Sequence, residues 1–441
     1  MTETMSYSRK EAGIIASVTV SSILPLLDGS IVNVIMPKLS EFFRVNQSQI
    51  QWVVTAYFLA SITGLLMSSP LQGRISTKLV WMFSSILFML GSLAVGLCND
   101  FISIIIARAV QGMGAGFLLP LSQTIIATEF GKERMRSAMG LVAVPAAGPL
   151  FGSLFTEYLS WQLLFFINIP IVLVSLWTGY RYLSLGKKQK KDFGVFPFLM
   201  LSTSLILFFY SLDNFQTEVS SNSLIMIVSS LLLLVFAFII NASSKKKIID
   251  FCEFRKRNYA VSMLMGLAVS FLFYSFMIFF PLSVSLDGNP KDGIIVLGVL
   301  LGLQGVGAWI GRKYLYQKLN EKSPFFVISL GVLVSTLSLL LFDFSNTLSA
   351  LGFFIRGTGL GIATIACLAA PVQWADREYI KDTSVITRLL QQIGGAAGGI
   401  FAGGLIYLIA SQGMSLHSAY LIFFGISAFL WLVMTLGTKY S

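Results

Sequence analysis

The chain contains fourteen apolar stretches, each long enough to cross a lipid bilayer as a helix. A helix needs about 20 apolar residues to span the hydrocarbon core, where each backbone N–H and C=O group must be hydrogen-bonded within the protein. The pattern therefore predicts an all-α integral membrane protein with 14 transmembrane helices. The predicted spans cover residues 11–37, 50–70, 79–98, 101–127, 137–157, 161–183, 193–212, 222–242, 258–285, 293–311, 324–342, 345–371, 383–411 and 417–437.

Basic residues are confined almost entirely to alternate loops between these spans. If the N-terminus is cytosolic, 25 of the 31 Lys and Arg residues lie in the N-terminal tail, in every second loop or in the C-terminal tail. Cytosolic loops of membrane proteins carry such an excess of Lys and Arg. We therefore expect cytosolic N- and C-termini in a multi-pass protein of a bacterial plasma membrane. The net charge of +11 follows from this topology, so no nucleic-acid partner is expected.

Few side chains are available for catalysis. Hydrophobic residues make up 55% of the chain, charged residues only 12%, and the mean hydropathy is +0.80, whereas a soluble domain is about a quarter charged. His417 is the only histidine, and the three cysteines are spaced for neither a disulfide nor a metal site. There is no phosphate-binding loop, so we expect a protein that is not an enzyme and has no metal or cofactor.

Two long basic segments divide the spans into groups. Residues 181–192 and 243–257 bracket the seventh and eighth spans and contain most of the lysines of the cytosolic loops. Such segments lie on an anionic inner leaflet or simply connect helices in the membrane plane, and we favour the connector. The predicted domains are a six-helix bundle over 1–183, two inserted helices with their flanking loops over 184–257, and a second six-helix bundle over 258–441.

The two groups of six helices share short motifs. Residues 108–116 (RAVQGMGAG) lie in the fourth span, and residues 356–361 (RGTGLG) lie in the fourth span of the second group. The turn after the second span contains Gly73 and Arg74, and the turn after the tenth span is expected over residues 311–313 (GRK). Weak internal symmetry of this kind is typical of transporters that bind substrate between two bundles near the bilayer midplane.

Six motifs in this order resemble those of the major facilitator superfamily, specifically its fourteen-span drug:proton antiporters, which include quaternary-ammonium and tetracycline exporters. The motifs occupy residues 27–37, 51–57, 108–114, 148–152, 161–170 and 391–395. The resemblance covers nearly the whole chain, although Thr77 stands where the family has an Asp. It implies alternating access between helices 1–6 and 9–14, with helices 7 and 8 as an accessory hairpin.

Asp28 is the first candidate for proton coupling. A charged residue at the centre of a transmembrane helix costs about 2.5–3.5 kcal/mol, so it is rare without a function. Burial favours the neutral carboxyl group, which would allow Asp28 to exchange protons. The alternative is a polar residue at a helix kink, held by a neighbouring helix. Arg108 either pairs structurally or helps to displace the proton, and Glu157 is a second candidate acid. We find no acid inside spans nine to fourteen.

Other polar and aromatic residues are candidates for the substrate cavity or the gates. An aromatic wall that includes Tyr57 suits planar lipophilic cations. The candidate cavity residues are Asn33, Tyr57, Gln111, Tyr274, Arg388, Gln391 and Gln392. The candidate gating and packing residues are Gly73, Arg74, Pro145, Gly148, Pro149 and Gly152.

These features predict proton-coupled multidrug efflux by alternating access. The expected partners are lipophilic small molecules, cationic or zwitterionic, and the lipid bilayer, with protons as the coupling ion. Two alternatives remain: an exporter or flippase of one native metabolite or lipid, and a membrane sensor or scaffold that does not transport. The buried charges Asp28 and Arg108 argue against the scaffold, because a scaffold gains nothing from charges placed in lipid.

Overall fold

The computed structural model describes residues 8–142, 160–185, 194–217, 221–286, 290–319, 321–341 and 346–439. Every regular element in these segments is helical. They fall into two compact units. Among the described residues, the first unit holds those up to Phe198 together with Ser244–Ile249. The second unit holds Leu199–Ser243 and everything from Asp250 onward.

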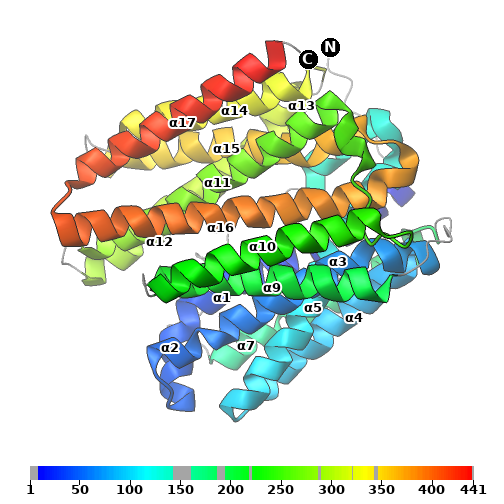
Figure 1. The fold of residues 1–441 in the computed structure, drawn as a ribbon, viewed down its shortest axis with the longest axis horizontal. Coiled ribbons are helices and arrows are strands. Elements are labelled where there is room, and N and C mark those ends of the chain that lie inside the picture. The colour runs from blue at the N-terminus through cyan, green and yellow to red at the C-terminus, as the bar shows by residue number, and fades with distance from the viewer. Residues whose placement is uncertain are drawn as a thin grey trace. The chain divides into compact units, whose positions relative to one another are not determined.

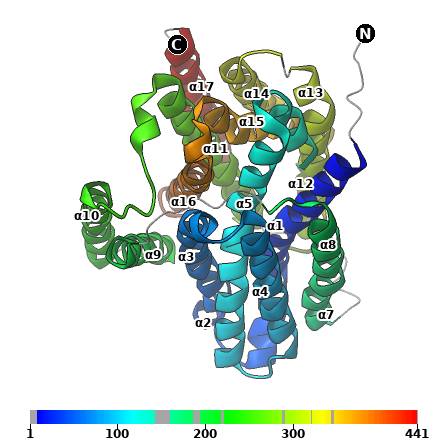
Figure 2. The ribbon, with the colours of Figure 1, turned by 90° about the vertical axis from the view of Figure 1, so that its right-hand side faces the viewer.

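The first unit is built around three long helices that lie side by side, α3 (Trp52–Arg74), α4 (Thr77–Leu97) and α5 (Phe101–Val142) (Figure 2). α1 (Arg9–Phe43) packs against α5 and α8 (Asn168–Tyr182), while the short helices α2 (Gln47–Ile50) and α7 (Trp161–Phe166) complete the unit. α1 begins at a capping box, in which Ser8 and Glu11 satisfy each other's backbone N–H groups.

The second unit contains α11 (Arg257–Leu286), which packs along α16 (Ile380–Gln412), and α15 (Asn346–Trp374), which packs along α12 (Pro290–Ile310) and α14 (Pro324–Ser338) (Figure 1). α17 (Leu416–Lys439) lies against α14. The unit also includes the end of α9 (Val195–Thr217), α10 (Ser221–Ser243), and the short elements η1 (Cys252–Arg255), η2 (Gly311–Leu315), α13 (Tyr316–Lys318), η3 (Leu339–Leu341) and η4 (Arg377–Tyr379).

Within the described residues, 11 helices are long and apolar enough to cross a membrane. Every predicted span except the fourth and fifth coincides with described helices to within about six residues at each end. α10, for example, covers Ser221–Ser243 where 222–242 was expected.

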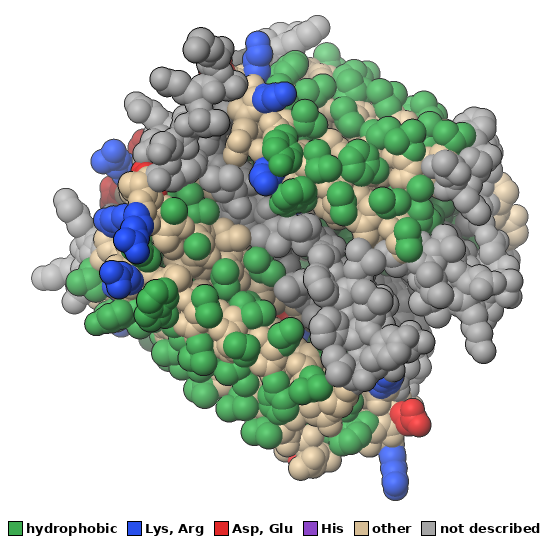
Figure 3. Space-filling model, turned by 180° about the vertical axis from the view of Figure 1, so that it is seen from behind, with side chains coloured by type: hydrophobic (Ala, Val, Ile, Leu, Met, Phe, Trp, Pro, Cys, Tyr) green, Lys and Arg blue, Asp and Glu red, His purple; other side chains and the backbone are tan. Residues whose placement is uncertain are grey.

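The loop expected between residues 127 and 137 is wrong, because α5 continues as a helix to Val142. Hydropathy detects only the apolar part of a helix, and this extension is rich in charged residues. The fifth span, 137–157, lies mostly outside the described residues, so the count of fourteen and the three-domain division remain predictions. On the face shown in Figure 3, hydrophobic side chains cover much of the described surface, as expected of a surface in contact with lipid.

Two segments expected in turns lie in helical elements. Gly73 and Arg74 form the last residues of α3, and the chain turns directly after them, at Ile75 and at Ser76, which caps α4. An Arg in the last turn also interacts favourably with the helix dipole. Residues 311–313 lie in η2, a π-helical turn that joins α12 to α13. Neither segment is a loop.

Glycines set the same close helix contacts in both units. A Cβ atom on Gly112 of α5 would meet the carbonyl oxygen of Tyr57 on α3, and a Cβ atom on Gly357 of α15 would meet that of Gln304 on α12. Glycine lets backbones approach this closely. The residue before this glycine is Gln111 in one unit and Arg356 in the other, so the expected equivalence of Arg108 and Arg356 is wrong by about one helical turn.

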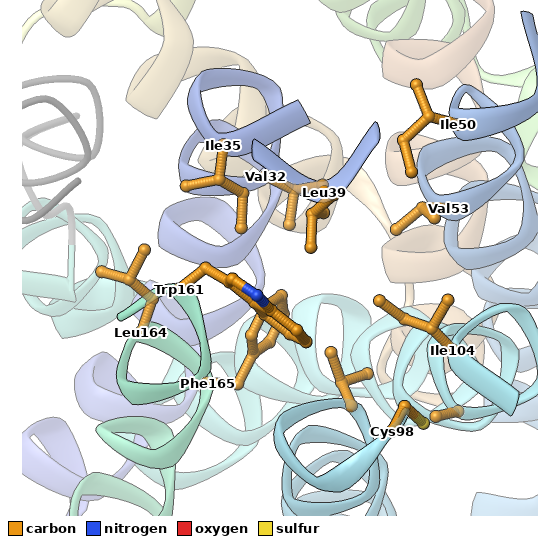
Figure 4. Close-up of a cluster of buried hydrophobic side chains, with 12 residues drawn as sticks. Val32, Ile35, Leu39, Ile50, Val53, Cys98, Ile104, Trp161, Leu164 and Phe165 are labelled. Carbon is orange, nitrogen blue, oxygen red and sulfur yellow. The ribbon is translucent and has the colours of Figure 1, made fainter. Parts of the chain in front are cut away.

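A cluster of apolar side chains fills one end of the first unit (Figure 4). It combines residues of α1 and α2, the starts of α3 and α5, the end of α4 and the short helix α7. Trp161 and Phe165 are its largest members. Ring contacts extend it toward the end of α1, because Phe42 and Phe43 both pack on Trp161. The cluster fixes the spacing of the helices that carry the buried charges of this unit.

Candidate functional site

Asp28 and Arg108 form a buried ion pair inside the first unit. Asp28 lies on α1 and is 3% exposed, and Arg108 lies on α5 and is 0% exposed. Nη1 of Arg108 is 2.5 Å from Oδ2 of Asp28. Nε2 of Gln111 donates to the other carboxylate oxygen, Oδ1, at 2.8 Å. Both oxygens of the carboxylate are therefore occupied, one of them by a full positive charge.

The guanidinium of Arg108 is held on several sides. Its Nη1 also donates to Oε1 of Gln111 at 2.7 Å, and its Nε donates to the carbonyl oxygen of Val53 at 3.1 Å. It lies over the ring of Tyr57, with its central carbon 4.2 Å from the ring centroid. Its Nη2 atom is buried and has no hydrogen-bond partner within the described part of the chain. The two N–H groups of Nη2 thus remain available to a water molecule or a ligand.

Three helices position these groups. Arg108 and Gln111 lie one turn apart on α5, so they face the same side. Tyr57 and Val53 lie one turn apart on α3, which approaches α5 closely at Gly112. The hydroxyl group of Tyr57 donates to the carbonyl oxygen of Pro25 on α1 at 3.5 Å and so joins the third helix.

This geometry has a chemical consequence. A buried ion pair is tolerated when its remaining donors and acceptors are satisfied, whereas breaking it by neutralising one partner costs about 3–5 kcal/mol. Protonation of Asp28 would neutralise the carboxylate and leave Arg108 without an anionic partner. The site therefore couples the protonation of one carboxyl group to the position of one arginine, and through it to the packing of α1, α3 and α5.

Several predicted residues are not placed by the structure. Glu157, Pro145, Gly148, Pro149 and Gly152 lie outside the described residues, and their roles remain predictions. Asn33 lies on α1, but its side chain is also outside the described part of the chain.

The remaining predicted cavity residues lie in the second unit. Nη1 of Arg388 on α16 donates to Oε1 of Gln391, one turn further along, at 3.1 Å. Oε1 of Gln392 is buried without a partner among the described residues. Tyr274 on α11 is 43% exposed and lies close to Gly395 of α16. These side chains gather where α11 meets α16, while Tyr57 and Gln111 belong to the ion-pair site of the first unit.

Arg356 is fixed within the second unit by uncharged groups. Its Nη2 donates to the carbonyl oxygen of Leu272 at 3.0 Å, and its Nη1 donates to the hydroxyl oxygen of Ser335 at 3.2 Å. The central carbon of its guanidinium lies 4.0 Å from the ring centroid of Phe276. No carboxylate among the described residues contacts it, which distinguishes it from Arg108.

Two buried acids in the second unit did not emerge from the sequence. Glu253 and Asp382 are each 4% exposed. Asp382 was missed because α16 begins at Ile380, three residues before the predicted span, and Glu253 because it lies in a loop between spans. Oε2 of Glu253 accepts hydrogen bonds from Nζ of Lys256 and from the backbone N–H of Asp376. The high density of charged residues at 250–257 and 376–382 is the sequence feature that could have indicated buried acids here.

Comparisons with known proteins agree with the fold. Residues 18–399 match the Major Facilitator Superfamily. Over 398 residues the chain is 26% identical to a multidrug resistance protein B homolog of Mycobacterium tuberculosis, which covers 86% of this chain and 73% of that protein. It is 26% identical over 252 residues to the riboflavin transporter RibZ of Clostridioides difficile, which covers 56% of this chain and only 54% of RibZ. The crystal structure of the human organic anion transporter MFSD10 superposes with a TM-score of 0.69 at 12% identity, covering 96% of this chain and 99% of that one.

Proposed function

Because this chain belongs to the Major Facilitator Superfamily, we propose that it exports lipophilic compounds in exchange for protons, as a fourteen-span drug:proton antiporter. Members of that superfamily are transporters and not enzymes. Its apolar helices make the chain a multi-pass membrane protein. Small-molecule substrates and a membrane environment follow from the family, while the proton, the drug substrates and the cytosolic termini belong to our proposal.

The observation that carries the proposal is the buried ion pair between Asp28 and Arg108. In the proposed cycle, a proton entering from outside neutralises Asp28 and releases Arg108. The uncompensated arginine then favours a rearrangement of α1, α3 and α5 that changes the side from which the site is reached. When Arg108 returns to Asp28, the positive charge displaces the proton to the cytosol. Each step needs only a proton and the side chains already in contact.

More of the relatives named here support export of several drugs than support export of one metabolite. The relative from Mycobacterium tuberculosis is named for multidrug resistance, and so is a protein of Bacillus subtilis that is 29% identical over 273 residues. The match to a riboflavin transporter favours the second candidate, an exporter of a single native metabolite. Both candidates use the same coupling site, so they differ only in the substrate.

Transport into inverted membrane vesicles tests the coupling. With an acidic lumen, we expect the wild type to accumulate tetramethylrhodamine, and Asp28→Asn to lose all accumulation driven by the pH gradient. The amide is nearly isosteric with the carboxylate, so insertion and thermal stability should be retained. Glu41→Gln is the matched control, because Glu41 is an exposed acid on the same helix. Wild-type accumulation by correctly inserted Asp28→Asn would refute proton coupling through this site.

A further inference from the structure

A pocket lies at one end of the second unit, where α11 and α14 begin and α15 and α17 end. Its volume is about 330 Å³, within the range of sites that bind small molecules. Four of its lining residues place it there: Asn258 in the first turn of α11, Ser323 directly before α14, Trp374 at the end of α15, and Thr435 near the end of α17. All four helices are long and apolar enough to cross a membrane, so the pocket lies near one membrane surface.

Aromatic rings form the apolar part of the pocket lining. The rings of Phe325 and Trp374 are stacked, with centroids 6.2 Å apart and an interplanar angle of 10°. Phe326 also lines the pocket and is 51% exposed, so the pocket opens at the protein surface. Among the described residues, no charged side chain lines it. An ion would therefore be costly to bury here, whereas an apolar molecule with an uncharged polar group suits the pocket.

Two polar groups of the lining are buried without a hydrogen-bond partner in the described part of the chain. They are the hydroxyl group of Ser329, a residue that is 6% exposed, and the indole N–H group of Trp374. The hydroxyl group of Ser338, on the same helix as Ser329, instead donates to the carbonyl oxygen of Ser335 at 2.7 Å. A buried donor without a partner is costly, and a buried indole N–H group usually has one. Rotation about the Cα–Cβ bond of Ser329 gives its hydroxyl group other staggered positions, from which it can reach a ligand.

The surface beside the pocket is apolar on α14 and α17. Leu432 and Leu436, on either side of Thr435, are each 49% exposed, and Phe326 is exposed on α14. Exposed apolar side chains on membrane-spanning helices face lipid, so the pocket opens beside the bilayer. At the ends of such helices, the bilayer changes from hydrocarbon to polar headgroups. Phospholipids carry their ester carbonyl groups at this depth, and these groups are uncharged hydrogen-bond acceptors attached to apolar chains.

We propose that this pocket binds the glycerol-ester region of a membrane phospholipid. Ser329 and Trp374 donate hydrogen bonds to an ester carbonyl oxygen, and the rings of Phe325 and Phe326 pack on the start of an acyl chain. Tryptophan suits this level of a membrane protein because its ring is apolar and its N–H group is a donor. The charged headgroup lies outside the uncharged pocket, so it does not determine the fit. This site goes beyond the proposed transport function and does not depend on proton coupling through Asp28.

Two phosphatidylcholines isolate the contribution of the ester carbonyl groups. One has ester-linked chains, and the other has ether-linked chains of the same length, so that only the carbonyl oxygens are missing. Purified protein in detergent is incubated with an equimolar mixture, and native mass spectrometry measures the ratio of the two lipids on protein that carries one lipid. We expect the wild type to carry the ester lipid at least about fivefold more often, the effect of one neutral hydrogen bond. Ser329→Ala should reduce this ratio at least about twofold, and Ser329→Ala combined with Trp374→Phe should bring it to one.

Controls separate this result from misfolding and from headgroup binding. Ser338→Ala removes a buried hydroxyl group from α14 that already has a partner, and it should leave the ratio unchanged. Binding of the ether lipid should be the same in all variants, which shows that they are folded. The preference should also appear with the corresponding pair of phosphatidylglycerols, because no charged side chain of the described residues lines the pocket.

Four results would overturn the proposal. They are a ratio of one in the wild type, a wild-type ratio in the double variant, an equal loss of both lipids in the variants, and a preference that appears with only one headgroup. Because lipid binding is measured without transport, failure of the proposed function would leave this test unaffected.

Discussion

At the residue scale, the chain uses arginine in three ways. Arg108 neutralises a buried carboxylate, Arg356 is held by carbonyl, hydroxyl and aromatic groups, and Arg388 retains donors without a partner among the described residues. The difference does not come from burial, since Arg108 and Arg356 are almost equally inaccessible. It comes from the presence of Asp28 in one unit and the absence of an equivalent contact in the other. In our proposal, the proton therefore binds in the first unit, where a buried carboxylate balances the arginine.

Gln111 should stabilise the ion pair between Asp28 and Arg108. Its Nε2 donates to the carboxylate of Asp28, and its Oε1 accepts from the guanidinium of Arg108. Gln111→Met keeps the approximate size of the side chain and removes both hydrogen bonds. The free energy of unfolding should then fall by about 1–3 kcal/mol, because two buried charged groups each lose a hydrogen-bond partner. Thermal unfolding in detergent measures the change, and a melting temperature equal to that of the wild type would show that Gln111 only packs.

At the element scale, close contacts between helices hold the ion-pair site together. α5 approaches α3 at Gly112 and again at Gly116, where a Cβ atom would meet the carbonyl oxygen of Ser61. Because the opposing atoms are backbone, they cannot move aside unless the helices separate. Separation would also move Tyr57 from beneath the guanidinium of Arg108. The close packing of α3 on α5 therefore also fixes the position of Tyr57 relative to the charge of Arg108.

Gly112→Ala should therefore destabilise the protein by about 1–3 kcal/mol, the usual cost of overpacking, and reduce transport. Gly404→Ala is the matched control, because Gly404 lies in the interior of α16 and a Cβ atom there would meet nothing within 4 Å. That substitution should be neutral or stabilising by up to about 1 kcal/mol, since alanine favours the helix. Thermal unfolding in detergent compares the two. Equal melting temperatures would show that the α3–α5 contact has room to relax.

A second contact between elements joins η1 to the connection between α15 and α16. Nζ of Lys256 lies 2.9 Å from Glu253 and 2.9 Å from Asp376. The hydrogen bond to Glu253, and then the one to Asp376, raise the pKa of Lys256 above its ordinary value of 10.5. The contacts of protonated Lys256 therefore contribute fully to the stability of the protein below pH 10.5. This contribution is lost as the pH rises through the raised pKa of Lys256.

Glu253→Gln should lower stability by about 1–3 kcal/mol at neutral pH, because a charged acceptor of two hydrogen bonds is lost. The difference from the wild type should shrink as the pH rises beyond 10.5. Melting temperatures measured in detergent across this range test the prediction. Glu378→Gln removes an exposed acid from the neighbouring η4 and should have little effect. If the difference in melting temperature between Glu253→Gln and the wild type does not change at high pH, the hydrogen bond from Lys256 is not what stabilises the protein at Glu253.

At the scale of the whole molecule, the balance of charge determines which gradient drives transport. If Asp28 alone takes up a proton, one proton enters for each substrate that leaves. Tetramethylrhodamine is a zwitterion, and its methyl ester is a cation. Export of the methyl ester is then electroneutral, whereas export of tetramethylrhodamine itself moves one net positive charge inward per cycle. Each 100 mV of membrane potential would contribute about 2.3 kcal/mol to the second process, or about a forty-fold gradient.

Proteoliposomes with equal pH on both sides and an imposed membrane potential distinguish these cases. We expect the potential alone to drive tetramethylrhodamine and to leave its methyl ester at equilibrium. Liposomes without protein provide the control for passive movement of each dye. Accumulation of the ester driven by potential alone, beyond that in liposomes without protein, would require a second titrating group, for which Glu157, outside the described residues, is the leading candidate.

The sequence by itself determined the elements of this protein. Hydropathy is a property of consecutive residues, and a helix in lipid satisfies its backbone hydrogen bonds locally, so most of the spans could be located from the sequence. The largest errors fall at helix ends: α5 continues to Val142 through an expected loop, η2 occupies an expected turn, and α16 starts early enough to include Asp382. These ends depend on capping and neighbouring contacts, which hydropathy does not measure.

Only the tertiary structure decided which polar side chains meet. The sequence assigned Asp28 and Arg108 to proton coupling and Tyr57 and Gln111 to the substrate cavity. Their assembly into one site depends on the rotation and spacing of α1, α3 and α5. The one-turn displacement between Arg108 and Arg356 became visible only from the glycine contacts. A sequence motif specifies which residues are available, whereas their partners depend on which face each helix turns toward its neighbours, and that is a property of packing between segments far apart in the chain.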